Sequence, residues 1–123
     1  MPDVSYQNVL NIILPSLPEN WIKIVMFVSF TEDVCDLKYY LRDNRNQYAD
    51  CFQFCTDQDN LLNILAQLHR EITGIRDQLS ANDRWTSMTL CIEADGSFNA
   101  DYDYSEASVE AAYYDEWKRR YLN

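Results

Sequence analysis

Hydrophobic residues in the first half of the chain alternate with a period of two over long stretches, which predicts β-strands. Residues 21–30 (WIKIVMFVSF) are largely apolar in both alternating sets, so they predict a strand that is buried on both faces. Residues 34–42 place apolar side chains on one face and polar side chains on the other. A polar turn at 43–46 separates them from a third strand near 47–54, and this arrangement predicts a three-stranded meander.

The longest periodic segment predicts a helix over residues 57–80. Its apolar side chains recur at steps of three and four and form one stripe, made by Leu61, Leu65, Leu68, Ile72, Ile75 and Leu79. Thr56 with Asp59 resembles a capping box at the start of this helix. A stripe of this kind also occurs in coiled coils, but three heptads between predicted strands favour packing against a sheet.

Residues 85–93 and 98–104 alternate again and predict a β-hairpin. The residues between them, ADGS at 94–97, contain Asp-Gly, which supplies the positive φ angles of a tight hairpin turn. Two sets of side chains alternate along the return strand: Phe98, Ala100, Tyr102 and Tyr104 on one face, and Asn99, Asp101 and Asp103 on the other. We expect the second, polar face to be exposed to solvent.

Helices are predicted at both ends of the chain. Residues 4–14 form a short amphipathic segment that Ser5 can cap and Pro15 ends. Residues 105–122 begin with acidic side chains and end with three basic ones, Lys118, Arg119 and Arg120. The dipole of a helix favours this distribution of charge.

The predicted order is therefore helix, three strands, helix, two strands, helix. This order is typical of an α+β fold with an antiparallel sheet of about five strands and helices packed on it. The length of 123 residues fits one domain spanning 1–123, and the 47% of hydrophobic residues can fill its core. We expect Trp85, Trp117, Phe98 and Tyr102 to lie in that core.

The chain is strongly acidic, with 20 Asp and Glu against 10 Lys and Arg and a formal net charge of −10. A charge of this sign argues against direct binding to nucleic acid or to anionic lipid, and it suits a basic partner. The chain has no apolar run long enough to span a membrane, and the N-terminus lacks the basic residues of a signal peptide. We expect a cytoplasmic protein without a membrane partner.

The sequence does not favour a metal or cofactor site. With two glycines, it contains no phosphate-binding loop. Cys51 and Cys55 could be combined with His69 as zinc ligands, but their spacing lacks the paired CxxC of secure zinc sites, and we expect all four cysteines to be reduced thiols. The segment DGSFNADYDYSE (95–106) approaches the pattern of a calcium loop, but its sixth position is Ala100 where that loop needs glycine.

Catalysis is not indicated either. The single histidine, His69, lies near the edge of the apolar stripe of the predicted 57–80 helix and has no nucleophile near it in sequence. Asp101 and Asp103 could form an acid–base pair, but alternate residues on an exposed strand face stay in water, where burial cannot tune their pKa values. We therefore do not expect an enzyme.

Acidic residues are concentrated in the last third of the chain. Between Arg84 and Lys118 there is no basic residue, while the same interval holds eight acids: Glu93, Asp95, Asp101, Asp103, Glu106, Glu110, Asp115 and Glu116. Tyrosines and Trp117 lie among these acids, and Tyr and Trp are common anchors of protein interfaces. Two interpretations remain open on composition alone, namely a surface that attracts a basic partner and a solvated face that keeps the protein soluble.

Several segments resemble a known family. Trp21 at the start of the first strand, the hairpin segment WTSMTL…EADGSFNADYDY (85–104) and the ending WKRRYL (117–122) are similar to the YezG-like immunity (antitoxin) proteins of bacterial polymorphic toxin systems. The resemblance covers most of the chain in order, although residues 43–56 do not contribute to it. It implies a small cytosolic protein that neutralises a cognate toxin, one that is secreted or delivered by contact and whose C-terminal domain is typically a nuclease.

The acidic character fits this implication, because nuclease sites that bind phosphates are basic. We therefore expect an immunity protein that blocks the active site or substrate groove of a toxin domain, as in contact-dependent growth inhibition. The candidate contact residues are Asp101, Asp103, Glu93, Glu106, Glu110, Tyr104 and Tyr113. An acidic adaptor domain that binds another basic protein is the alternative.

Overall fold

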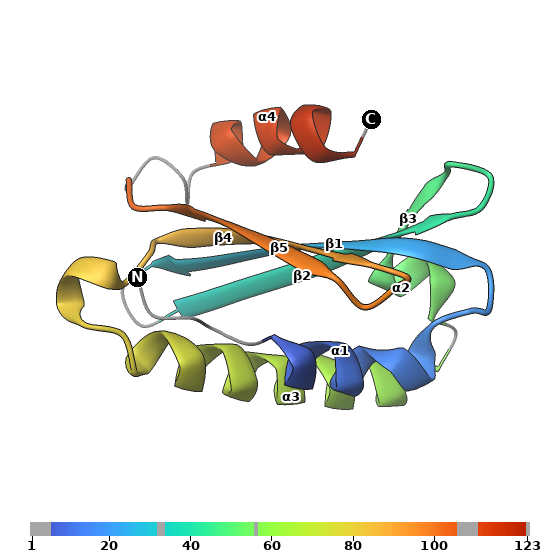
Figure 1. Cartoon of the computed structure of the whole chain (residues 1–123), viewed down its shortest axis with the longest axis horizontal. Helices are drawn as coiled ribbons and strands as arrows, with labels where there is room; N and C mark the ends of the chain where they lie inside the picture. The colour runs from blue at the N-terminus through green and yellow to red at the C-terminus, as the bar shows by residue number, and fades with distance from the viewer. Residues whose placement is uncertain (1–5, 32–33, 56, 106–110, 123) are drawn as a thin grey trace.

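The computed structural model describes residues 6–31, 34–55, 57–105 and 111–122. It contains one five-stranded antiparallel sheet with the strand order β3-β2-β1-β4-β5 (Figure 1). The strands are β1 (Trp21–Thr31), β2 (Val34–Asp43), β3 (Tyr48–Asp50), β4 (Ser87–Glu93) and β5 (Phe98–Asp103). The helices are α1 (Gln7–Ile13), α2 (Cys51–Phe54), α3 (Gln58–Asp77) and α4 (Ala111–Tyr121), with short 3-10 turns η1 (Leu14–Ser16) and η2 (Ala81–Asp83). The predicted α+β fold with its antiparallel sheet is confirmed.

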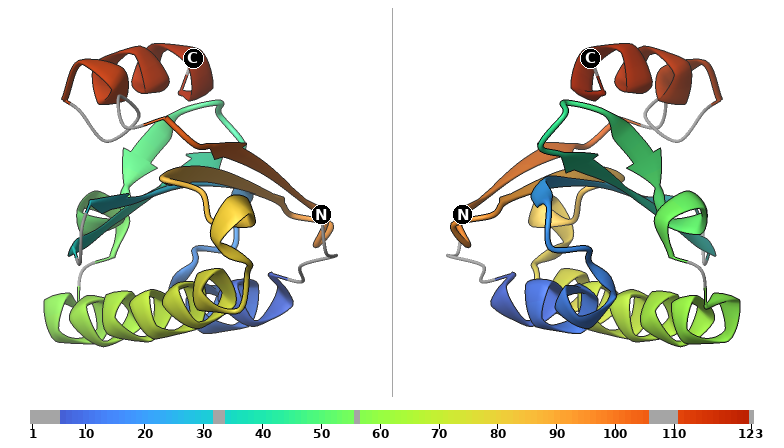
Figure 2. Two further views of the ribbon diagram at one scale, coloured as in Figure 1. Left: turned by 90° about the vertical axis from the view of Figure 1, so that its left-hand side faces the viewer. Right: turned by 90° about the vertical axis from the view of Figure 1, so that its right-hand side faces the viewer.

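The sheet is covered on both faces. Figures 1 and 2 show α1 and α3 side by side under one face, while α4 lies over the opposite face. The two layers explain why β1 is apolar in both alternating sets of side chains. Ile24, Met26 and Val28 are buried on the side of α1 and α3, whereas Val25 and Phe27 pack with Trp117 of α4.

The larger core lies between the sheet and the pair α1 and α3. The apolar stripe of α3 faces it as predicted: Leu61, Leu68 and Ile72 are fully buried, and Leu65 and Ile75 pack at its margin. Burial of a large aliphatic side chain stabilises a fold by about 1.5–3 kcal/mol, so this stripe fixes α3 on the sheet. The predicted sheet-packing helix is therefore confirmed, although it ends at Asp77 and not near residue 80, so the buried Leu79 lies just beyond it.

The smaller core lies under α4 and is mostly aromatic. The Trp117 ring centroid is 5.0 Å from that of Phe27 and 5.9 Å from that of Tyr40. The Trp117 indole N–H donates a 2.7 Å hydrogen bond to Thr89 Oγ1 on β4. Tyr40 and Tyr114 also join β2 to α4 through a hydrogen bond between their hydroxyls. Long side chains thus hold α4 to the sheet.

The turn between β4 and β5 forms as predicted, with a difference in detail. Glu93 N–H donates to Ser97 O at 2.8 Å, and Gly96 N–H donates back to Glu93 O at 2.9 Å. Gly96 has φ +91°, while Asp95 does not share this positive angle. Asp95 instead accepts hydrogen bonds from the backbone and hydroxyl of Ser97, a side-chain turn that needs no left-handed residue.

Two local predictions are wrong. The third strand, expected near 47–54, ends at Asp50, because Asp50 and Gln53 form a capping box that starts α2 instead. The cap of α3 is Asp57, whose carboxylate accepts from Asn60 N–H at 3.1 Å, and not the expected pair of Thr56 and Asp59. Ser5 and Thr56 lie outside the described residues.

Among the four side chains expected in the core, one differs. Trp85 and Trp117 are 1% and 2% exposed, and Tyr102 packs partly buried against the larger core. Phe98 is 39% exposed, although it points to the side of α1, because β5 is an edge strand and leaves one flank of the ring uncovered. Its ring meets Tyr6 edge-on at 6.0 Å.

Candidate functional site

The two central acidic candidates lie beneath α4. Asp101 and Asp103 project from the polar face of β5, as predicted, but this face is turned toward α4 and not only toward solvent. Tyr121 OH donates to Asp101 Oδ2 at 2.9 Å, and Tyr113 OH donates to Asp103 Oδ2 at 3.2 Å. Both aspartates therefore also serve to anchor α4, a role that the alternating pattern of β5 did not predict.

A cavity of about 230 Å³ lies between α4 and the strands β4 and β5. We call it the α4–β5 cavity, and its lining is Ser87, Thr89, Asp101, Tyr102, Asp103, Tyr113, Arg120 and Tyr121. The walls carry two carboxylates, several hydroxyl groups and one guanidinium. Such a lining offers hydrogen-bond acceptors for a cationic or polar side chain.

Hydrogen bonding favours the charged form of the Asp103 carboxylate. The backbone N–H of Ser105 donates to Asp103 at 2.8 Å and is the main reason why the pKa of Asp103 lies below its usual range. Burial, followed by the nearby carboxylates, raises the pKa of both Tyr113 and Tyr121. At neutral pH the tyrosines remain neutral donors and Asp103 remains an anionic acceptor.

Cations do little to neutralise this surface. Within the described part of the chain, the salt bridge joins Lys118 Nζ and Asp115 Oδ1 at 3.7 Å, on the exposed side of α4. Asp101 and Asp103 form none there, although Arg120 lines the same cavity. The Arg120 guanidinium is instead 5.5 Å from the ring centre of Tyr121. Negative charge therefore remains available to an external partner.

The other predicted contact residues do not join this cluster. Glu93 ends β4 on the same face but lies four residues from Thr89, the pairing partner of Asp101, which is about 13 Å along a strand. Tyr104 is 47% exposed, and its pKa is raised first by burial and then by Asp83 of η2. Glu106 and Glu110 lie outside the described residues. The structure thus brings together Asp101, Asp103 and Tyr113.

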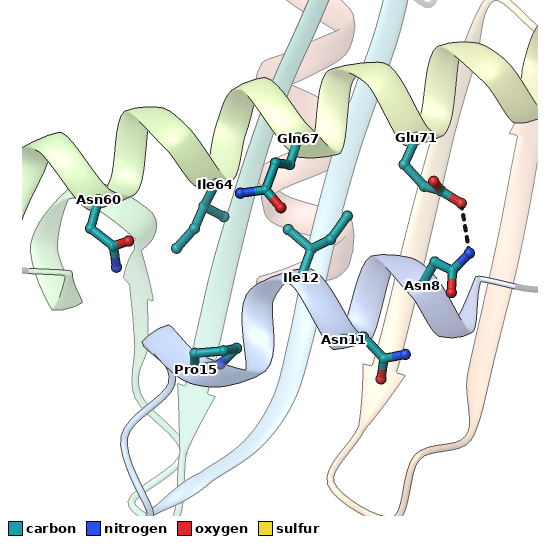
Figure 3. A pocket seen from close by; sticks show the side chains of 8 residues that line it. All are labelled: Asn8, Asn11, Ile12, Pro15, Asn60, Ile64, Gln67 and Glu71. Carbon is teal, nitrogen blue, oxygen red and sulfur yellow. Dashed lines mark hydrogen bonds between the residues drawn. The ribbon is translucent and has the colours of Figure 1, made fainter.

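A second hollow, which the sequence did not predict, lies between α1 and α3 (Figure 3). This groove of about 470 Å³ is lined mainly by amide and aliphatic side chains, namely Asn8, Asn11, Ile12, Pro15, Asn60, Ile64, Gln67 and Glu71. Asn8 crosses it to donate a 3.2 Å hydrogen bond to Glu71 Oε1. The asparagines of the groove are exposed to solvent, and only the pairing of the two helices brings the lining residues together.

The thiols and the histidine form no recognisable catalytic or metal-binding group. All four cysteines are free, and Cys51 and Cys55 are buried in the larger core, where burial raises the pKa of Cys51. His69 is half-buried on α3 beside Leu65 and Arg70. Among the described residues there is no cluster of three His, Cys, Asp or Glu side chains that could hold a metal ion. No helix in that part of the chain is long and apolar enough to cross a membrane.

Comparison with known proteins identifies the family. The family described as "Immunity protein YezG-like" matches residues 3–122, which is nearly the whole chain. The chain belongs to this family. The resemblance read from Trp21, the 85–104 hairpin and the WKRRYL ending is therefore confirmed.

Two relatives in the family are both named "Immunity protein YezG". The protein of Bacillus spizizenii is 22% identical over 108 residues, which cover 82% of this chain and 67% of the relative. The protein of Bacillus subtilis is 25% identical over 97 residues, which cover 73% of this chain and 64% of the relative. The matched region thus spans about two thirds of the length of each relative.

The residues that carry the resemblance mainly determine the fold. Trp85 and Trp117 are buried in the two separate cores, and Gly96 supplies the positive φ of the hairpin turn. The structural roles of these motif residues do not identify the surface that contacts a partner. Charge and geometry must provide that information.

Proposed function

We propose that this protein is an immunity protein that binds a cognate toxin domain in the cytoplasm and neutralises it. The membership of residues 3–122 in the YezG-like immunity family is the observation that carries the proposal. The absence of a recognisable catalytic group among the described residues is compatible with an inhibitor that acts by binding. The toxin domain is expected at the C-terminus of a larger protein of a polymorphic or contact-dependent system.

The proposed partner is a nuclease domain with a basic substrate groove. The protein has a net charge of −10, and the interval between Arg84 and Lys118 contains eight acids and no base. A surface of this kind attracts the groove that normally holds phosphates, and it accelerates association with it. Asp101, Asp103 and Tyr113 form the centre of the proposed contact surface, with Glu93 and Tyr104 at its margins.

An acidic adaptor that binds another basic protein is the second candidate, since the same charge distribution would serve it. The two candidates differ in one consequence. An immunity protein rescues cells from one specific toxin, whereas an adaptor has no such effect.

Co-expression tests the proposal directly. The C-terminal domain of the toxin encoded beside the gene is expressed from an inducible promoter, with and without this protein. We expect growth to be restored only when the protein is present, and we expect the two purified proteins to form a stable complex. Cell death in both cases, together with no association of the purified proteins, would show that the proposal is wrong.

The double substitution Asp101→Asn and Asp103→Asn then tests the surface separately from the function. Asparagine keeps an oxygen that can accept from Tyr121 and Tyr113, so α4 stays anchored while the negative charge is lost. We expect slower association and a weaker dependence of affinity on salt. Unchanged affinity and unchanged salt dependence would place the interface elsewhere on the molecule.

A further inference from the structure

One edge of the sheet is open in the described structure. In the strand order β3-β2-β1-β4-β5, β5 is the terminal strand, and no described segment pairs with its outer side. Figure 1 shows β5 along the near edge of the sheet, between the layer of α1 and α3 and the layer of α4. An edge strand presents unpaired backbone N–H and C=O groups, which can template pairing with a second chain.

The register shows which backbone groups of β5 are free. Glu93 N–H bonds to Ser97 O of the hairpin, whereas Ala94 N–H bonds in the opposite direction, to Ile22 O. Residues of β4 with odd numbers therefore bond toward β5, and their partners on β5 are Asn99, Asp101 and Asp103. It follows that Phe98, Ala100 and Tyr102 direct their N–H and C=O groups outward.

The opposite edge of the sheet, formed by β3, is less accessible for pairing with an added strand. β3 is only three residues long, and the capping box of Asp50 and Gln53 turns the chain into α2 directly after it. α2 then packs beside β2, where the ring centroids of Phe54 and Tyr39 are 5.8 Å apart. Short edge strands and covering helices are common protections against unwanted pairing. β5 is twice as long as β3, with six residues, and no helix among the described residues pairs with or replaces a strand at its outer edge.

The side chains of β5 also specify the kind of strand that can pair with it. Asp101 and Asp103 lie on one face of the strand, while Phe98 is 39% exposed on the other. Antiparallel pairing of two copies of β5 about Asp101 or Tyr102 would place aspartates of the two chains directly opposite each other, which is destabilising. A strand with Lys or Arg at alternate positions would place a cation opposite each aspartate.

We infer that β5 is a docking edge to which the toxin domain adds an extended segment with alternating basic residues. This inference rests on the proposed immunity function and specifies how the complex forms. Backbone hydrogen bonds at Phe98, Ala100 and Tyr102 supply the pairing, and Asp101 and Asp103 select a basic strand. The outer edge of β5 gives non-hydrogen-bonded pairs at the aspartates, where side chains of paired strands come closest.

Amide hydrogen exchange measures this arrangement residue by residue. In the free protein, Asn99, Asp101 and Asp103 should be protected by β4, while Ala100 and Tyr102 should exchange fast. Addition of the purified toxin domain from the co-expression experiment should slow exchange at Ala100 and Tyr102 by roughly tenfold or more, because each then donates to the added strand. The alternation is diagnostic, since burial under a protein that does not pair with β5 would not select every second amide.

A substitution pair tests the contribution of the backbone to affinity. Ala100→Pro removes an outward N–H that β4 does not use, which edge strands tolerate. We expect it to weaken toxin binding on the order of tenfold to a hundredfold, because a carbonyl of the partner loses its donor. Ala100→Val keeps the N–H and enlarges the side chain at the same position, so it should change affinity less than Ala100→Pro.

The outcomes distinguish this inference from the function on which it rests. If the toxin domain binds but exchange at Ala100 and Tyr102 is unchanged, the docking edge is wrong and the immunity function stands. If these amides already exchange slowly in the free protein, and their protection increases with protein concentration, the protein pairs with itself through β5 and the inference is also overturned. If the toxin domain neither binds nor is neutralised, the proposed function and this inference fail together. Hydrogen exchange remains decisive even if Ala100→Pro does not fold.

Discussion

Trp117 is the side chain whose loss should separate α4 from the rest of the molecule. It is 2% exposed, stacks with Tyr114 at a centroid distance of 5.6 Å, and donates its indole N–H to Thr89 across the layer. Trp117→Ala removes both the packing and this hydrogen bond. The larger core between the sheet and α3 does not include Trp117, so it should remain folded.

The expected loss of unfolding free energy in Trp117→Ala follows from the burial of this side chain. Replacing a buried Trp by Ala costs about 3–5 kcal/mol, which is a large part of the ~5–15 kcal/mol that stabilises a domain of this size. With a urea dependence of about 2 kcal/mol per molar, the midpoint of unfolding should fall by roughly 2 M. Trp117→Phe keeps a ring in the cluster but leaves Thr89 Oγ1 without this donor, so its cost should be nearer 1 kcal/mol.

Urea denaturation followed by far-UV circular dichroism measures these differences, and amide exchange shows where they arise. In Trp117→Ala, amides of α4 should lose protection while amides of β1 and α3 keep it. Equal midpoints for the wild type and Trp117→Ala would refute the reasoning. Loss of protection in α3 as early as in α4 would also refute it, since the two cores would then form one cooperative unit.

Two further predictions concern the turn between β4 and β5 and the pH dependence of stability. Gly96→Ala should destabilise the protein by about 1 kcal/mol in thermal unfolding, because φ is +91° at this position. A Cβ there would meet no neighbour within 4 Å, so the cost is one of backbone conformation and not of a clash. Gly74→Ala, at an exposed position of α3, is the matched control and should stabilise the protein by about 0.5–1 kcal/mol. Equal effects at the two glycines would contradict the turn geometry. The folded pKa of Asp103 lies below its ordinary value of 3.8, so its charge stabilises the fold above about pH 4 and this stabilisation is lost as the pH falls through the folded pKa. Asp103→Asn should therefore lower stability by less than about 1 kcal/mol at pH 7, and the difference from the wild type should shrink below pH 4 in urea titrations; a difference that grows on acidification would be inconsistent with the hydrogen bond from Ser105.

Periodic burial made much of the fold predictable. β1 is apolar on both faces because two layers of helices cover it, and the stripe of α3 reports one continuous contact with the sheet. Local side-chain chemistry limited the prediction elsewhere. Asp50 and Gln53 satisfy backbone groups of a helix start, and this local gain ends β3 although the segment around it is rich in residues that favour strands.

The sequence predicted which face of β5 carries the candidate acidic residues, but not which side chains surround them. Alternation along β5 placed Asp101 and Asp103 on the correct face, and Asp101 is exposed as expected. It could not show that Tyr113 and Tyr121 lie above them, because that depends on where α4 docks. The spacing of the aromatic side chains in α4 carried a usable signal, since Tyr113, Trp117 and Tyr121 at steps of four require an apolar surface to pack on.

Inhibition of the isolated toxin domain tests the central claim most directly. The toxin domain is incubated with DNA and with RNA while this protein is added in increasing amounts, and the rate of cleavage is measured. We predict that cleavage stops at one molecule of this protein per toxin domain, and that the Asp101→Asn and Asp103→Asn double variant requires a larger amount at raised salt. Cleavage that continues undiminished at a tenfold excess of the wild-type protein would contradict the proposed inhibition of a nuclease.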